Sequence, residues 1–231
     1  MDNDIYHVLL SDCLLAVVLF GLFWYVARLA RSVRGIKAWG GAHLVYTLGA
    51  TLLDAFSPAF AEAGESAAAV FALNFGSLLA CIGMVGLAWS IILFATQRAL
   101  SRIEIALMPA AIALSLLAWI LRGDADAQGI ALSTVEIVSL AVMAWRLFRM
   151  RDRPGRLPAR LMAGGCLALI LLYGSVVPGW LDGLFGIDPI WVSVDLSIWF
   201  MLNFCMLMLT SFRAAESWRH GAMHDLLTGL L

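Results

Sequence analysis

The chain has 231 residues, of which 62% are hydrophobic and 13% are charged, and its mean hydropathy is +0.91. A soluble domain is roughly half apolar and about a quarter charged, so this composition excludes a soluble globular domain and indicates a membrane protein. The formal net charge of −1, with the charges segregated along the sequence, gives no reason to expect a nucleic-acid partner.

Seven apolar segments are long enough to cross the roughly 30 Å of hydrocarbon in a bilayer, which takes about 20 helical residues. The first has no basic region before it and no small-residue cleavage site, so it is interpreted as a retained helix and not as a signal peptide. The sequence therefore predicts an all-α membrane protein built as a seven-transmembrane-helix bundle. The predicted helices are residues 5–27, 38–58, 67–95, 105–121, 129–148, 161–180 and 189–212.

The basic residues are distributed unequally between the two ends of these helices. Fourteen of the 15 lysines and arginines end or follow the first, third, fifth and seventh segments, and Arg122 alone follows an even-numbered one. Cytoplasmic loops carry the excess of basic residues in membrane proteins. The sequence therefore predicts a multi-pass protein with its N-terminus outside and its C-terminus in the cytoplasm.

Five polar side chains, each on a different predicted helix, share one depth. At a rise of 1.5 Å per residue they lie roughly 6–11 Å below the outer boundary, where no lysine or arginine is found. Ionisable residues inside a membrane span usually face the bundle interior or a water-filled cavity, so this outer polar layer is the predicted ligand-binding site. Protonated acids that hydrogen-bond between helices are the alternative interpretation, and the sequence leaves both open. The layer consists of Asp12, Asp54, Asn74, Glu136 and Asp195.

Other polar and reactive residues inside the spans are interpreted as packing groups. His43 and Asn203 lie nearer the inner half, and each alone is more typical of a satisfied core residue than of a ligand. The chain has neither a His-Glu-x-x-His pattern nor a Gly-x-Ser-x-Gly pattern, so we predict no catalytic residue and no metal site. The four cysteines all lie in apolar runs and are interpreted as small buried residues without a disulfide framework.

Residues 213–224 change from apolar to mixed composition and predict a cytoplasmic continuation of the seventh helix. Ala214, Ala215 and Trp218 fall on one side of that helix, where they are expected to meet a twin helix in a homodimer. An ordinary amphipathic segment at the membrane exit is the alternative.

The last nine residues read Met223-His224-Asp225-Leu226-Leu227-Thr228-Gly229-Leu230-Leu231. Asp225, Leu227, Thr228, Gly229 and Leu230 match in register the first residues of the GGDEF (diguanylate cyclase) domain, which the segment resembles. The layout of helices before it is similar to the MASE-type integral membrane sensory domains that precede such cyclases. The resemblance implies a transmembrane sensor domain at 1–212, a coupling helix at 213–224 and the truncated start of a GGDEF domain at 225–231.

The resemblance also implies a function and partners. In that family two GGDEF domains, each with one GTP and with Mg²⁺, face each other to make cyclic di-GMP, so a homodimer in the bacterial inner membrane is expected. This chain is then a sensory input and dimerisation domain, with no enzymatic activity or cofactor of its own. Its expected stimulus is a lipophilic or amphipathic small molecule in the outer polar layer. A small transporter or ion pathway that uses the intramembrane carboxylates is one alternative function, and a passive membrane anchor is another.

Overall fold

The computed structural model describes residues 3–30, 33–150, 155–182 and 189–228; within these ranges the side chains of residues 3–6, 180–182, 189, 218 and 220–228 lie outside the description. The elements in chain order are α1 (Asn3–Leu29), α2 (Ile36–Thr51), a π-helical turn η1 (Leu52–Phe56), α3 (Ser57–Glu62), α4 (Ser66–Thr96), α5 (Arg102–Leu121), α6 (Ala125–Phe148), α7 (Arg156–Asp182) and α8 (Pro189–Thr228).

Seven helical segments are long and apolar enough to cross a membrane, which confirms the predicted seven-helix bundle. The second is the combined α2–η1–α3 segment, Ile36–Glu62, and the other long helices supply one segment each. The observed helices extend a few residues beyond the predicted spans, because a helix continues past the apolar stretch into its polar ends. The described residues contain no strand.

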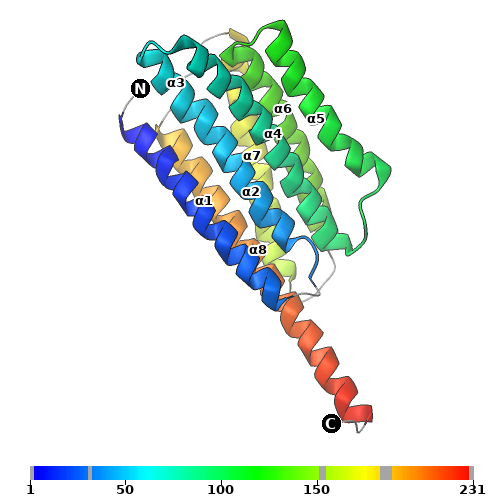
Figure 1. Cartoon of the computed structure of the whole chain (residues 1–231). Helices are drawn as coiled ribbons and strands as arrows, with labels where there is room; N and C mark the ends of the chain where they lie inside the picture. The colour runs from blue at the N-terminus through cyan, green and yellow to red at the C-terminus, as the bar shows by residue number, and fades with distance from the viewer. Residues whose placement is uncertain (1–2, 31–32, 151–154, 183–188, 229–231) are drawn as a thin grey trace.

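The helix α4 lies at the centre of the bundle and packs against α2, α5 and α6, while α7 joins α6 to α8. The first helix packs along α2 and touches α8 at few positions. Figure 1 shows that α8 extends beyond the other helices at the end of the bundle opposite the N-terminus. We call these two ends the N-terminal end, where α1 begins, and the C-terminal end, where α8 leaves the bundle.

Glycines allow α2 and α4 to approach each other closely. A Cβ atom added to Gly83 would lie 2.3 Å from the backbone nitrogen of Tyr46, and one added to Gly49 would lie 2.3 Å from that of Ala80. Any larger residue at either position would push the two backbones apart, as expected where small residues bring membrane helices together. This contact fixes the position of Tyr46, whose hydroxyl points into the candidate site described below.

The π-helical turn η1 interrupts the second span and carries Asp54. Pro58 follows four residues later and has no N–H to donate to the carbonyl of Asp54, so the regular α-helical pattern of hydrogen bonds cannot continue there. Single π-helical turns inside α-helices occur frequently at functional sites.

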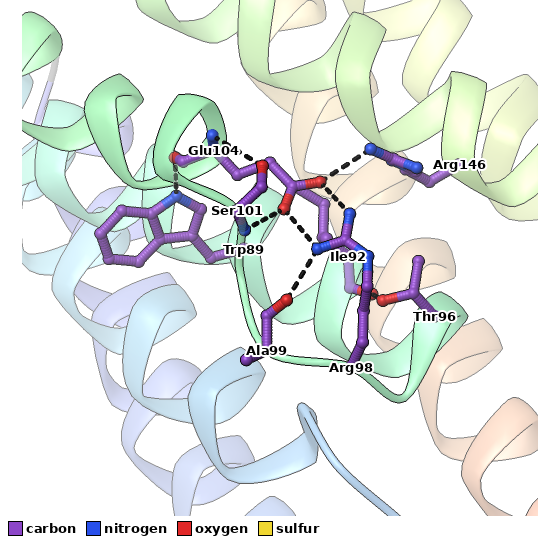
Figure 2. Close-up of polar contacts among 8 residues, drawn as sticks. All are labelled: Trp89, Ile92, Thr96, Arg98, Ala99, Ser101, Glu104 and Arg146. Carbon is purple, nitrogen blue, oxygen red and sulfur yellow. Dashed lines mark hydrogen bonds and ion pairs between the residues drawn. The ribbon is translucent and has the colours of Figure 1, made fainter.

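Glu104 is a buried carboxylate at the C-terminal end of the bundle with a full set of partners (Figure 2). The side chain, in a residue only 7% exposed, accepts two hydrogen bonds from Arg98, at 2.7 and 2.8 Å, and one from Arg146, at 2.7 Å. It also closes a capping box with Ser101 at the start of α5. The predicted site residues do not include Glu104, although the Ser-x-x-Glu spacing signals such a cap.

Candidate functional site

A cavity of about 90 Å³ lies in the half of the bundle nearer the N-terminal end, between α1, α2, η1, α6, α7 and α8. It contains four of the five residues of the predicted outer polar layer, Asp12, Asp54, Glu136 and Asp195, and we call it the carboxyl cavity. No lysine or arginine is among the described residues that line it. Its lining is Leu9, Asp12, His43, Tyr46, Thr47, Ala50, Leu53, Asp54, Gly129, Leu132, Ser133, Glu136, Tyr173, Val176, Trp191, Val192, Asp195, Leu196 and Trp199.

The fifth predicted residue, Asn74, lies apart from this cavity. Its side-chain oxygen accepts a hydrogen bond from Nε2 of Gln128 at 2.7 Å, and its amide nitrogen donates to the carbonyl of Val70 at 2.8 Å. Gln128 in turn donates to the carbonyl of Ser115 at 3.2 Å. Asn74 therefore belongs to a polar contact that joins α4, α5 and α6, and its position favours a packing role.

Two buried tyrosines connect two of the cavity carboxyls. The hydroxyl of Tyr46 donates to Oε1 of Glu136 at 2.8 Å, and the hydroxyl of Tyr173 donates to Oδ1 of Asp195 at 2.7 Å. The two tyrosine oxygens lie 3.2 Å apart. We call this series, Glu136–Tyr46–Tyr173–Asp195, the tyrosine chain; it links α6, α2, α7 and α8.

A count of protons shows what the tyrosine chain can do chemically. The chain contains three oxygen–oxygen contacts but only two hydroxyl protons, because each tyrosine has one. All three contacts are hydrogen bonds only when one of the two carboxyls carries a proton. A shift of the three protons along these hydrogen bonds then moves the protonated carboxyl from Glu136 to Asp195. The arrangement can hold one proton and share it between α6 and α8.

Trp199 holds the tyrosine chain from the α8 side. Its indole nitrogen donates to the hydroxyl of Tyr173 at 3.0 Å, and its ring centroid lies 5.0 Å from that of Tyr46. Sequence analysis does not identify Tyr46, Tyr173 or Trp199 as site residues. The feature of the sequence that could have identified them is an aromatic ring with a polar atom inside a membrane span. A buried tyrosine or tryptophan usually has a hydrogen-bond partner, so such a residue indicates a polar neighbour.

His43 carries a buried N–H donor that has no partner in the described part of the chain. The indole N–H of Trp39 can only donate, so it fixes Oδ1 of Asn203 toward itself at 2.9 Å. The amide nitrogen of Asn203 then faces Nε2 of His43 at 2.9 Å, and Nε2 must accept. The proton of the ring therefore sits on Nδ1, which has no hydrogen-bond partner among the described residues. His43 is 4% exposed, and it lines the carboxyl cavity.

The indole nitrogen of Trp191 is a second buried donor that has no partner in the described part of the chain. Trp191 also lines the carboxyl cavity. A water molecule can reach neither this indole nitrogen nor Nδ1 of His43, so these two donors are enclosed by packing and do not open onto the cavity. Among the cavity carboxyls, Asp12 and Asp54 accept no hydrogen bond from the described residues.

A groove of about 360 Å³ adjoins the carboxyl cavity between α1 and α8. The two spaces share Asp12, His43, Leu196 and Trp199. Apolar residues at the bundle surface form much of the remainder, since Val8 and Leu15 are each 41% exposed and Phe200 is 61% exposed. We call this space the α1–α8 groove; it connects the polar cavity to the surface that faces hydrocarbon in a bilayer. Its lining is completed by His7, Ser11, Leu19 and Asn203.

The residues predicted for the dimer contact lie on the part of α8 near and beyond the bundle. Ala214 packs against the core of its own bundle and Ala215 is exposed. The side chain of Trp218 lies outside the described residues, as do those of the GGDEF-like segment. The helix itself continues without a break to Thr228.

Comparison with known proteins finds no matching protein-family model, no matching curated protein and no matching solved structure.

Proposed function

We propose that this chain is the membrane-embedded sensory and dimerisation domain of a diguanylate cyclase. One observation carries the proposal: α8 is a single helix that bears Asp195 and Trp199 at the carboxyl cavity and runs unbroken to Thr228 in the GGDEF-like segment. A ligand that moves Asp195 or Trp199 therefore moves α8, the same helix that leads to the output domain. The expected stimulus is a lipophilic or amphipathic small molecule, because the α1–α8 groove opens toward lipid.

The energy needed for such control is small. A ligand that changes the output tenfold must favour one state of the bundle over the other by about 1.4 kcal/mol. One or two hydrogen bonds, each worth about 1 kcal/mol, supply this difference. Asp195 and Glu136 lie on different helices and are joined through the tyrosine chain, so a ligand bound to either carboxyl acts on the position of α8 relative to α6.

The exit of α8 from the bundle is anchored to the end of α4. The guanidinium of Arg213 donates to the carbonyl of Phe94 and lies 4.1 Å from the centre of the Phe94 ring. The same carbonyl accepts a hydrogen bond from Gln97, which ends α4 in a left-handed conformation with φ 51°. This contact holds α8 at a fixed point between the cavity and its extension. A shift of α8 at Asp195 then pivots about this point and moves the extension.

Orientation in the bacterial inner membrane is part of the proposal, with the N-terminus outside and the C-terminus in the cytoplasm. The charge asymmetry of the loops supports it. Alkaline phosphatase fused after Leu231 should be inactive, whereas green fluorescent protein at the same position should fluoresce. The opposite pair of results would reverse the orientation and exclude a cytoplasmic output.

The function is tested with an output domain. Residues 1–224 are fused to the GGDEF domain of a characterised cyclase, and cyclic di-GMP is measured by mass spectrometry in cells and in nanodiscs. We expect the fusion to be dimeric and to exceed the isolated GGDEF domain in activity, and Asp195→Asn to change its activity at least about threefold. Glu65→Gln, an exposed carboxyl at the same end of the bundle, is the matched control. A monomeric fusion with the activity of the isolated domain defeats the proposal.

Two alternatives predict different results. A passive anchor gives a dimeric, active fusion that no cavity substitution affects. A transporter gives solute flux in proteoliposomes above that of empty vesicles. The structure favours transport less, because the core between the carboxyl cavity and the C-terminal end is formed mainly by fully buried apolar side chains such as those of Leu87, Ile91, Leu140 and Met143.

A further inference from the structure

We propose that the carboxyl cavity and the α1–α8 groove together bind a single-chain alkylammonium amphiphile, that is, a molecule with an ammonium head and one alkyl tail. This inference deepens the proposed sensory function and rests on it for any effect on output. Binding itself is a property of this chain alone and is tested without an output domain.

The carboxyl groups select the positive charge of the head. Glu136 and Asp195 each accept one tyrosine hydroxyl, and no hydrogen bond to Asp12 or Asp54 is found among the described side chains. A buried carboxylate requires a cation or a full set of donors, and the described lining contains no lysine or arginine. An alkylammonium group brings one positive charge and three donors, so it supplies what the four carboxyls lack. A carboxylate or phosphate head would add to the repulsion and is excluded.

The size of the cavity limits the head of the ligand. The volume of about 90 Å³ equals roughly three water molecules, which suits a head of a few atoms and excludes a large ring system. The buried N–H groups of His43 and Trp191 are inaccessible even to water, so the carboxyls and the tyrosine hydroxyls are the polar groups that meet the head.

The α1–α8 groove selects the tail. It begins at Asp12 and His43, which it shares with the carboxyl cavity, and continues along apolar side chains toward the surface. Val8, Leu15 and Phe200 are exposed where the groove opens. Because α1 and α8 touch at few positions, an alkyl chain fits between them without displacing a packed core. The head then lies against Asp195 on α8 while the tail separates α8 from α1.

The test uses three 12-carbon probes that differ only in the head: dodecylamine, dodecan-1-ol and dodecanoic acid. Each is titrated calorimetrically into the full chain in phosphatidylcholine nanodiscs, and the heat measured with protein-free nanodiscs is subtracted to remove partitioning into lipid. We expect the amine to bind about tenfold more tightly than the alcohol. The acid should show no saturable binding.

Variants assign each preference to its residue. Asp195→Asn should remove the preference for the amine over the alcohol, and Asp54→Asn should weaken it, whereas Glu65→Gln should leave it unchanged. If a variant does not fold, the three probes on the unaltered chain still decide the question. Equal affinity for amine and alcohol, preferred binding of the acid, or no binding because the cavity holds only water each overturns the proposal.

The result is separable from that of the cyclase fusion. Binding of the amine without any effect on the activity of the fusion defeats the sensory proposal and leaves the ligand assignment standing. A fusion whose activity depends on Asp195 but which does not bind the amine defeats the ligand assignment alone.

Discussion

Buried carboxyls at the two ends of this bundle have opposite surroundings. Glu104, at the C-terminal end, is bound by two arginines and a helix cap (Figure 2). The carboxyl cavity, in the other half, holds four carboxyls and no basic residue among those described. A buried charge with complete partners holds a structure together, and an incomplete set is a binding opportunity. The difference separates a carboxyl whose partners the protein supplies from carboxyls whose partners it supplies only in part.

The charge asymmetry of the sequence explains why the two ends differ. Fourteen of the 15 lysines and arginines end or follow the odd-numbered predicted spans, and two of them, Arg98 and Arg146, bind Glu104. At the N-terminal end Arg122 is already paired with Asp124 at 2.9 Å. The distribution that predicts orientation in the membrane therefore also leaves the carboxyls of the cavity without cations from the protein.

The largest effect is expected when the complete site is broken. Glu104→Gln keeps the shape of the side chain but leaves Arg98 and Arg146 without their shared anion and weakens the cap of α5. We expect the free energy of unfolding to fall by about 2–4 kcal/mol. The measurement is denaturant unfolding in mild detergent, followed by circular dichroism. Glu65→Gln, exposed at the start of α4, should change stability by less than about 0.5 kcal/mol. A Glu104 variant as stable as this control would show that the cluster is not structural.

The second effect concerns the tyrosine chain. The tyrosine whose hydroxyl makes more contacts should lose more stability when it is replaced by phenylalanine. The hydroxyl of Tyr173 contacts Asp195, Tyr46 and Trp199, whereas that of Tyr46 contacts only Glu136 and Tyr173. Tyr173→Phe should lower the free energy of unfolding by about 1–3 kcal/mol, because it leaves the indole N–H of Trp199 without an acceptor and Asp195 without its hydroxyl donor. Tyr46→Phe should lower it by about 1 kcal/mol. The same unfolding assay measures both. The reverse order would mean that the chain of hydrogen bonds does not run through Tyr173.

The third effect is local and tests the anchor of α8. Arg213→Gln removes the guanidinium that binds the carbonyl and ring of Phe94, a contact worth about 1 kcal/mol. A spin label at the exposed position 215 should become more mobile, while global stability changes little. Arg219→Gln, which lies farther along the same helix, should leave the label unaffected. Equal mobility in both variants would remove the fixed point proposed for α8.

Much of the fold was predictable from the sequence because length and hydropathy determine which segments can cross a membrane. The seven predicted helices are confirmed, with ends extended by polar residues such as those of Arg102–Glu104 at the start of α5. Orientation and dimerisation stay predictions, since they depend on the membrane and on a second chain.

The candidate site was predictable only in part, because depth along a helix does not tell which neighbour a residue faces. Depth along the spans groups Asp12 and Asp195, which line one cavity in the structure, but it also includes Asn74, which faces Gln128 on another side of α4. Tyr46 and Tyr173 become site residues only when the helix neighbours are known. The π-helical turn that carries Asp54 has Pro58 as its only local signal.

The smallest change in the free energy of unfolding is expected for Asp54→Asn in the carboxyl cavity. Its expected sign is opposite to that for Glu104→Gln or the change is zero, so it tests the contrast between the two sites directly. Asp54 lines the carboxyl cavity and accepts no hydrogen bond from the described residues, so Asp54→Asn removes a buried acid without breaking a contact. The free energy of unfolding should stay the same or rise by at most about 1 kcal/mol, whereas the loss of Glu104 lowers it. Because the two carboxyls lie toward opposite ends of the bundle, their effects should add within about 0.5 kcal/mol in the double variant. A fall of more than about 1 kcal/mol for Asp54→Asn alone would show that Asp54 has a structural partner, and the contrast between the two sites would then be one of degree.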